Sequence, residues 1–324
     1  MIVVTGGAGF IGSALVWELN NRGIDDVLIV DQLGISEKWK NLVGLKFKDY
    51  LEKATFRDLV ATGNLDSEIS LILHMGACSS TTELNASYLA DNNYQFSKEI
   101  ITFAVSNGIR MIYASSAATY GDGSLGYDDF ESIVHLSPMN MYGFSKQMVD
   151  CWVSKNNLLD QIVSLKFSNV FGPNEYHKGD MRSVPNKAFH QIHENGTIGL
   201  FKSYKTDYRD GEQKRDFIYV KDVVSMVLFF LEHQDIHGIF NIGSGNARTW
   251  NELAIAVFDS LGMDPKIEYI EMPQQIRNKY QYYTELPMSK LQMAGYNSPI
   301  LSLEEGIKDY VQNYLSGKRH LAQS

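Results

Sequence analysis

Tyr142 and Lys146 are the residues whose types and spacing best suit proton transfer. They stand four positions apart in segment 140–155, whose periodicity predicts a helix, so both side chains should share one helix face. A tyrosine ordinarily has a pKa of about 10, and a nearby ammonium favours the phenolate. We therefore expect Lys146 to lower the pKa of Tyr142, which would let that tyrosine act as a general base or acid near neutral pH.

Ser116 follows the predicted strand 111–114. The carboxyl ends of strands line the ligand crevice of a doubly wound sheet, so Ser116 can hydrogen-bond the substrate oxygen that gains or loses a proton. The alternative is a serine that only caps a helix or a turn. His74 ends another predicted strand, and we interpret it as structural rather than catalytic.

A glycine-rich loop at residues 5–12 follows one predicted strand and opens a predicted helix. Glycines in such a loop permit a tight turn and let the backbone approach a pyrophosphate, while the helix N-terminus offers free N–H groups. The loop fits the dinucleotide spacing twice, as Gly7-x-Gly9-x-x-Gly12 and as Gly6-x-x-Gly9-x-x-Gly12. We therefore expect a nicotinamide dinucleotide here, and Lys146 can reach its ribose.

Asp31 and Lys38 bear on which dinucleotide binds. Asp31 ends the second predicted strand, where a carboxylate can bond the 2′-hydroxyl of NAD. Lys38 lies just beyond and could pair instead with the 2′-phosphate of NADP. The residues alone leave NAD and NADP equally open.

The pattern of elements predicts how these residues are positioned. Short β-branched runs alternate with helical segments through the first half, which is typical of an α/β protein with a doubly wound parallel sheet, the Rossmann fold. We expect a dinucleotide-binding domain at 1–170, to which segments near 217–250 return, and a smaller C-terminal α/β lobe for substrate, mainly 171–324. The tail 317–324 should be frayed.

Composition narrows the functional classes. The chain has 324 residues and a net charge of −9, which disfavours a nucleic-acid partner. It begins directly with a strand-like run, has no signal-peptide pattern and no apolar run of membrane-spanning length, so we expect a cytoplasmic protein without a membrane partner. Cys78 and Cys151 should be reduced thiols, and we expect no metal site.

Together these motifs resemble the extended short-chain dehydrogenase/reductase superfamily and, within it, the family of bacterial ADP-heptose 6-epimerases. The resemblance runs nearly end to end. Its carriers are residues 3–13, 91–94, 114–121 and 169–173, and the more particular Gly-Ala-Cys-Ser-Ser-Thr-Thr-Glu at 76–83 and His-Lys-Gly at 177–179.

The resemblance implies inversion of carbon 6 of the heptose in ADP-D-glycero-β-D-manno-heptose, a step toward the lipopolysaccharide inner core. In this reaction, that carbon would be oxidised transiently to a ketone with tightly held NADP, and the hydride would return to its opposite face. Such a reaction would require a proton-handling group on each side of the carbon. Tyr142 matches one base and Lys178 the other; from the residues alone Lys178 would be a loop lysine. It must lose its proton to act, which needs burial or nearby positive charge. Homo-oligomers, typically pentamers, are also implied.

The resemblance also assigns binding residues. Positions that match cofactor contacts are Gly6, Gly9, Phe10, Ile11, Gly12, Asp31, Gln32, Lys38, Lys53, Met75, Gly76, Ala77, Cys78, Ser79, Asn92, Lys146, Val170 and Lys178. Those that match substrate contacts are Ser116, Asn169, Asp180, Phe201, Arg215 and Tyr280. Lys38 at its matching position favours NADP over NAD.

Three departures from the family pattern stand out. Segment 203–213 looks longer, and Asp180 stands where a serine is expected. Near residues 185–190 the match does not choose between Lys187 and His190 as a substrate contact.

The main alternative is another nucleotide-sugar epimerase, such as a UDP-hexose 4-epimerase. A 4,6-dehydratase is disfavoured because Ser116 is followed by Ala-Ala-Thr with no adjacent Asp-Glu pair. A non-catalytic redox sensor would have no need of Tyr142, Lys146 and Ser116 together.

Overall fold

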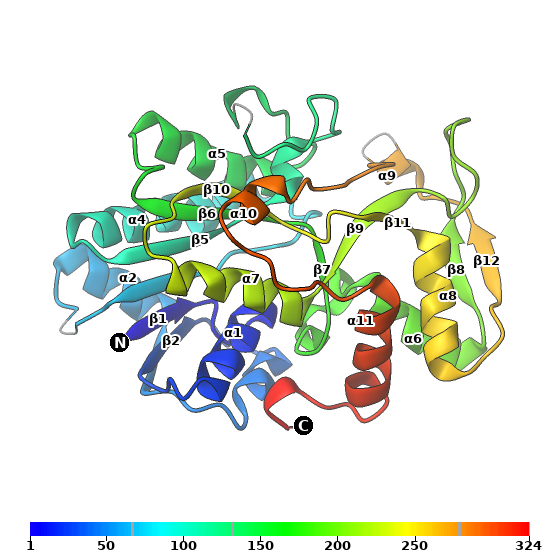
Figure 1. Ribbon diagram of the computed structural model, residues 1–324, viewed down its shortest axis with the longest axis horizontal. Coiled ribbons are helices and arrows are strands. Elements are labelled where there is room, and N and C mark those ends of the chain that lie inside the picture. The colour runs from blue at the N-terminus through cyan, green and yellow to red at the C-terminus, as the bar shows by residue number, and fades with distance from the viewer. Residues whose placement is uncertain (66–67, 131–132, 278–279, 324) are drawn as a thin grey trace.

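A seven-stranded parallel sheet is the centre of the larger domain in the computed structural model, which describes residues 1–65, 68–130, 133–277 and 280–323 (Figure 1). The strand order is β10-β6-β5-β4-β1-β2-β3, and every neighbouring pair is parallel. The strands are β1 (Ile2–Thr5), β2 (Val27–Asp31), β3 (Asp49–Glu52), β4 (Leu71–His74), β5 (Arg110–Ser116), β6 (Ile162–Phe167) and β10 (Gly238–Ile242). This order confirms the predicted doubly wound fold.

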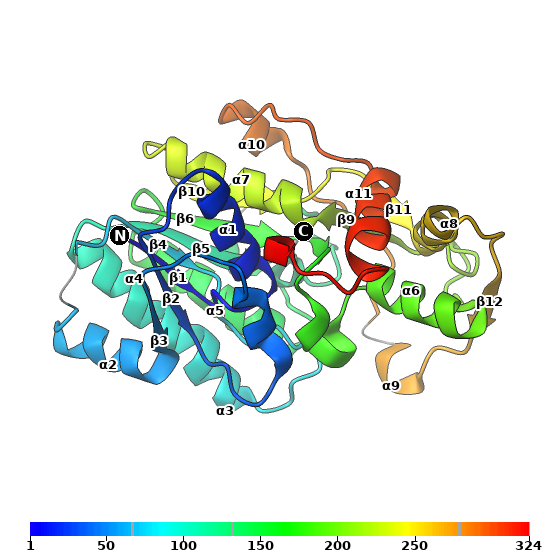
Figure 2. The ribbon, with the colours of Figure 1, turned by 90° about the horizontal axis from the view of Figure 1, so that it is seen from below.

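Helices cover both faces of the sheet, as Figure 2 shows from below. Helices α1 (Phe10–Asn21) and α7 (Val220–Glu232) pack on one face, and α2 (Lys53–Thr62), α4 (Phe96–Ser106) and α5 (Met141–Lys155) pack on the other. Strands β1, β2 and β4 are buried along their whole length. Continuous apolar runs such as Ile2-Val3-Val4 suit strands that are covered on both faces.

The smaller lobe contains two short sheets at the right of Figure 1. One has the order β11-β9-β7, and the other pairs β12 with β8. Its elements are β7 (Asn169–Phe171), α6 (Val184–Asn195), β8 (Ile198–Phe201), β9 (Lys214–Tyr219), β11 (Ala247–Thr249), α8 (Trp250–Leu261), β12 (Ile267–Ile270) and α11 (Leu303–Asp309). Of the chain between 214 and 250, α7 and β10 join the main domain, while β9 stays in the small lobe.

The remaining helices are short or irregular. They are α3 (Ala86–Leu89), α9 (Gln274–Arg277) and α10 (Ser289–Met293). Helix α4 is preceded by a π-helical turn at Ala90–Gln95, and α11 continues into another at Tyr310–Leu315. No helix of the described ranges is both long enough and apolar enough to cross a bilayer.

The tail at 317–323 is anchored by two buried residues rather than frayed, so that prediction was wrong; residue 324 lies outside the described residues. His320 and Leu321 are buried. The Leu321 backbone N–H donates to Asn174 Oδ1 at 3.0 Å, and His320 Nδ1 lies 2.8 Å from Asn41 Oδ1. These partners lie far away in sequence, so local composition gave no sign of them.

Asn41 joins the tail to the glycine loop. Its Nδ2 donates to the carbonyls of Ala8 and Asn174, both at 2.9 Å, while its Oδ1 faces His320. One buried amide thus connects the loop that follows β1, the loop that follows β7 and the tail. Since a buried polar group without its partner is costly, Asn41 should matter for stability.

We expect Asn41→Ala to lower the free energy of unfolding by about 2–4 kcal/mol, because three buried polar groups lose a partner at roughly 1 kcal/mol each. Urea denaturation measures the change. Asn21→Ala, at an exposed asparagine of α1, is the matched control and should have little effect. Equal stability of the two variants would contradict the role given to Asn41.

Candidate active site

The crevice lies where the winding of the sheet reverses, between β1 and β4. The glycine loop follows β1, and its backbone nearly touches the end of β4: a Cβ on Gly6 would lie 2.7 Å from the Gly76 Cα. A Cβ on Gly12 would lie 2.1 Å from the Gly6 carbonyl oxygen. Only glycine fits at these positions, and Gly6 also has a positive φ of 67°. The loop is therefore built for close approach of a ligand to backbone.

Two adjoining cavities of about 360 and 280 Å³ occupy this crevice. Every residue expected to contact the cofactor lines one of them. The first is lined by Gly6, Gly9, Phe10, Ile11, Gly12, Asp31, Lys38, Met75, Gly76, Ala77, Ser79, Lys146, Val170 and Lys178. The second adds Gln32, Lys53, Cys78 and Asn92. The N-terminus of α1, which no side chain caps, opens toward the glycine loop.

Asp31 is held by three donors. Its carboxylate accepts from the backbone N–H groups of Ala8 at 2.9 Å and Gln32 at 2.7 Å, and from Lys38 Nζ at 2.6 Å. The bond to Ala8 fixes the glycine loop to the end of β2. The bond to Lys38 offsets the negative charge of Asp31 at the rim of the cavity.

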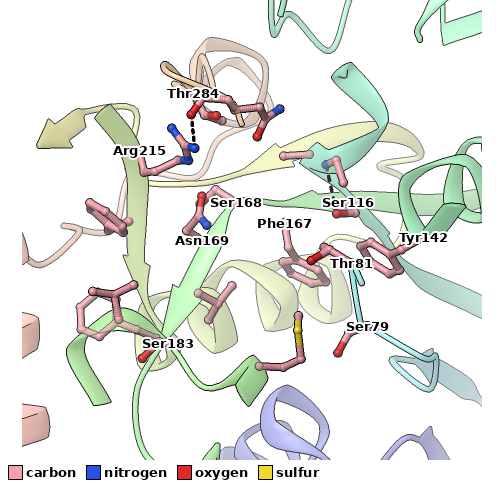
Figure 3. Close-up of a pocket in the computed structure, with 18 of the residues that line it drawn as sticks. Ser79, Thr81, Ser116, Tyr142, Phe167, Ser168, Asn169, Ser183, Arg215 and Thr284 are labelled. Carbon is pink, nitrogen blue, oxygen red and sulfur yellow. Dashed lines mark hydrogen bonds between the residues drawn. The ribbon is translucent and has the colours of Figure 1, made fainter. Parts of the chain in front are cut away.

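A third cavity, of about 440 Å³, adjoins the first and holds Ser116 and Tyr142 at one end and Arg215 at the other (Figure 3). Ser116 ends β5, and its Oγ accepts from the Ala118 backbone N–H at 3.1 Å. Tyr142 lies in the first turn of α5, which Asn140 caps by accepting from the Gly143 N–H at 2.8 Å. The ends of a strand and a helix thus bring serine and tyrosine to one surface.

Burial raises the pKa of Tyr142, and a hydrogen bond with Ser116 opposes that change. The expectation that Lys146 lowers this pKa was wrong for the chain alone. Lys146 Nζ donates to the Ala114 carbonyl at 2.6 Å and lies 4.8 Å from the centre of the Tyr113 ring. Burial lowers the pKa of Lys146 to about 7, so its ammonium is only partly populated at neutral pH.

Lys178 lines both the first cofactor cavity and the third cavity. It belongs to a 3₁₀ turn at Tyr176–Met181, and its Nζ lies 5.3 Å from the centre of the Phe10 ring. Burial lowers the pKa of Lys178, while the nearby Glu175 carboxylate opposes the change. Its surroundings thus favour the neutral amine that a base requires.

Arg215 is 7% exposed at the far end of the third cavity. Its guanidinium lies 5.1 Å from the Tyr280 ring centre and 5.7 Å from that of Trp250, and donates to the carbonyls of Lys214 and Gln281. Within the described ranges it forms no ion pair with a carboxylate. A buried cation without a carboxylate at a cavity wall suits an anionic ligand.

The structure brings most expected substrate residues to this cavity, but not all. Asn169 and Tyr280 line it. Phe201 is outside the lining and contacts Tyr280 edge to face, with ring centres 6.3 Å apart. Asp180 is exposed, and its carbonyl accepts from Lys187 Nζ at 2.6 Å. Neither Lys187 nor His190 is among the lining residues.

Other lining residues were not foreseen. They include Thr81, Ser168, Ser183, Trp250, Gln281 and Thr284. Ser168 directly follows β6, so the strand-end argument that found Ser116 would have found it too. Gln281 and Thr284 lie in a long irregular segment without a local pattern.

Comparisons with known proteins place this geometry in a family. Residues 2–243 match the model of the NAD dependent epimerase/dehydratase family. The ADP-L-glycero-D-manno-heptose-6-epimerase of Nitratidesulfovibrio vulgaris is 52% identical over 98% of both chains, and that of Fusobacterium nucleatum is 48% identical over 98% of both.

Among solved structures, the ADP-L-glycero-D-manno-heptose-6-epimerase of Helicobacter pylori is 30% identical with a TM-score of 0.80, covering 96% of this chain and 95% of the other. The fold, the geometry of the crevice and the sequence identity all indicate the same family. The chain belongs to the NAD-dependent epimerase/dehydratase family, in the branch of the ADP-L-glycero-D-manno-heptose-6-epimerases.

Proposed function

We propose that this protein inverts carbon 6 of the heptose in ADP-D-glycero-β-D-manno-heptose to give ADP-L-glycero-β-D-manno-heptose, with tightly held NADP. The observation that carries the proposal is that Tyr142 and Lys178, from different elements, line the same cavity. An epimerase must handle protons on both sides of one carbon. The names of relatives at 48–52% identity support the same substrate.

The crevice fits a nicotinamide dinucleotide by its shape and chemistry. Added Cβ atoms would fill the glycine cradle, and the uncapped N-terminus of α1 suits a pyrophosphate. Lys146, at the edge of the same crevice, is the residue we expect to hold the nicotinamide ribose. When bound, the cofactor supplies reversible hydride transfer.

Tyr142 and Ser116 form one proton-handling side of the cavity. Ser116 orients the substrate oxygen by hydrogen bonding, and Tyr142 takes its proton or returns it. Burial raises the pKa of Tyr142, so its phenol is protonated in the resting chain. An oxidised cofactor held in this crevice would add a positive charge, which would favour the phenolate.

Lys178 forms the other side. Because burial lowers its pKa, the neutral amine is populated at lower pH than for an exposed lysine. A neutral amine can accept a proton from the substrate hydroxyl, and the resulting ammonium can give it back. Arg215, at the other end of the cavity, is placed to bind the ADP diphosphate.

We propose NADP rather than NAD because Lys38 forms an ion pair with Asp31 at the rim of the crevice. The 2.6 Å bond between them offsets a carboxylate that would otherwise repel a 2′-phosphate. Lys53, whose Nζ donates to Asn92 Oδ1 at 2.7 Å, adds a second positive charge to that cavity. We further propose a cytoplasmic homo-oligomer that makes a lipopolysaccharide-core precursor.

The first test incubates purified protein with ADP-D-glycero-β-D-manno-heptose and no added cofactor. We expect conversion to the L-glycero epimer, because the reaction returns the hydride and consumes no cofactor. Anion-exchange chromatography separates the epimers. Absence of conversion in protein that carries cofactor, together with activity on a UDP-hexose, would refute the substrate assignment.

Tyr142→Phe and Lys178→Met should each lower kcat at least a hundredfold, since each removes one proton-transfer group. Both should leave bound cofactor in place, measured by its absorbance after gel filtration. Lys155→Met, at an exposed lysine that ends α5, is the control and should keep normal turnover. Normal kcat in either site variant would exclude that residue as a base.

In wild type, the epimerase activity should rise with pH as Lys178 loses its proton.

Lys38→Ala should lower the affinity for NADP relative to NAD by roughly tenfold to hundredfold, because a charge-assisted bond is lost and Asp31 is left without its cationic partner. Fluorescence titration with NADPH and NADH measures the ratio. Lys40→Ala, whose lysine pairs with Glu37 outside the cavities, should keep the wild-type ratio. Equal ratios in both variants would contradict the NADP assignment.

A further inference from the structure

A buried ion pair lies behind the site and lines none of its cavities. Asp150 on α5 and Lys166 on β6 are 3.0 Å apart, and each side chain is 1% exposed. Removing two charges from water is costly, so such a pair contributes little stability by itself. Its hydrogen bonds indicate another role.

Asp150 ties α5 to two strands. Its Oδ2 accepts from Ser115 Oγ at 2.7 Å, and its Oδ1 accepts from Ser164 Oγ at 2.9 Å. Ser115 is the residue next to Ser116 on β5. The carboxylate therefore fixes the strand end that carries Ser116 against the helix that carries Tyr142.

Lys166 holds the chain on the other side of Ser116. Its Nζ donates to Thr119 Oγ1 at 2.5 Å, and Thr119 Oγ1 in turn donates to the Ser116 carbonyl at 2.8 Å. The same ammonium lies 4.8 Å from the centre of the Tyr120 ring. Hydrogen bonds to Asp150 and Lys166 thus hold the chain on both sides of Ser116.

Lys146 lies one turn before Asp150 on the same face of α5. Its Nζ bonds the Ala114 carbonyl at 2.6 Å, while Asp150 bonds the next residue, Ser115. Two successive turns of the helix are therefore joined to consecutive residues of β5. Figure 3 shows the result, with Ser116 and Tyr142 side by side at one end of the cavity.

We propose that Asp150 and Lys166 are positioning residues that fix Ser116 against Tyr142 and hold the ammonium form of Lys146 at the cofactor. Neither touches substrate or cofactor in this role. The inference rests on the functions proposed for Ser116, Tyr142 and Lys146.

The charges around Lys146 support it. Burial lowers the pKa of Lys146, and the Asp150 carboxylate is the largest opposing influence, followed by Cys78 beyond β4. His74, facing from β4, is neutral because burial and Lys146 lower its pKa to about 3. From β5 the uncharged Tyr113 ring faces Lys146, and Tyr142 lies one turn before it on α5. Removing Asp150's charge must therefore lower the pKa of Lys146.

The test compares Asp150→Asn, the double variant Asp150→Asn/Lys166→Met and the control Asp160→Asn, at an exposed aspartate between α5 and β6. The cofactor affinity of each is measured by NADPH fluorescence across pH, and kcat and KM with ADP-heptose are measured in parallel. Since Lys146 is charged below its pKa, losing Asp150 should move the loss of affinity at high pH downward by roughly one unit. We expect kcat to fall roughly ten- to hundredfold with little change in KM.

The double variant separates positioning from folding. Asp150→Asn alone leaves the Lys166 charge buried and should lower the thermal midpoint, whereas the double variant should regain stability. It should keep the shifted pH profile and the low kcat. A stable double variant with the wild-type profile and kcat would overturn the proposal. If wild type fails to epimerise ADP-heptose but the affinity profile still shifts, the proposed function fails and the role of the ion pair toward Lys146 stands.

Discussion

The close approach of two backbones, at Gly6 after β1 and Gly76 after β4, is the constraint on which the site depends. A Cβ on either glycine would lie within 3.0 Å of the other residue's backbone, so any larger residue would force the strand ends apart. With both glycines in place, the loop turns back over the sheet, and α1 presents its N-terminus to the crevice. The first cofactor cavity and the third cavity then share one wall, which includes Ser116, Tyr142 and Lys178.

Burial sets the proton affinities at that wall. It raises the pKa of Tyr142 and lowers those of Lys146 and Lys178, so all three groups move toward their neutral forms. The neutral form suits Lys178, which must accept a proton. It does not suit Lys146, which should stay charged. The Asp150 carboxylate acts on the second lysine from behind the site, out of reach of substrate.

The sequence was informative where local chemistry is demanding. The glycine loop, Asp31 and the strand end at Ser116 could be predicted because turns, helix termini and buried strands restrict residue type within a few positions. β3 (Asp49–Glu52) and α6 (Val184–Asn195) were not foreseen: the first is a polar edge strand, and the second begins with Val-Pro-Asn in an irregular region. The pKa of Tyr142 and the network around Asp150 depend on contacts between distant segments, which no local pattern encodes.

The packed tail has a consequence for how the protein is made. Asn41 and the glycine loop leave the ribosome early, yet His320, which bonds Asn41, is synthesised 279 residues later. At 5–20 residues per second, that interval is on the order of tens of seconds. During translation the cofactor cradle therefore lacks its final support, and a nascent chain can fold its sheet before it can hold its dinucleotide firmly.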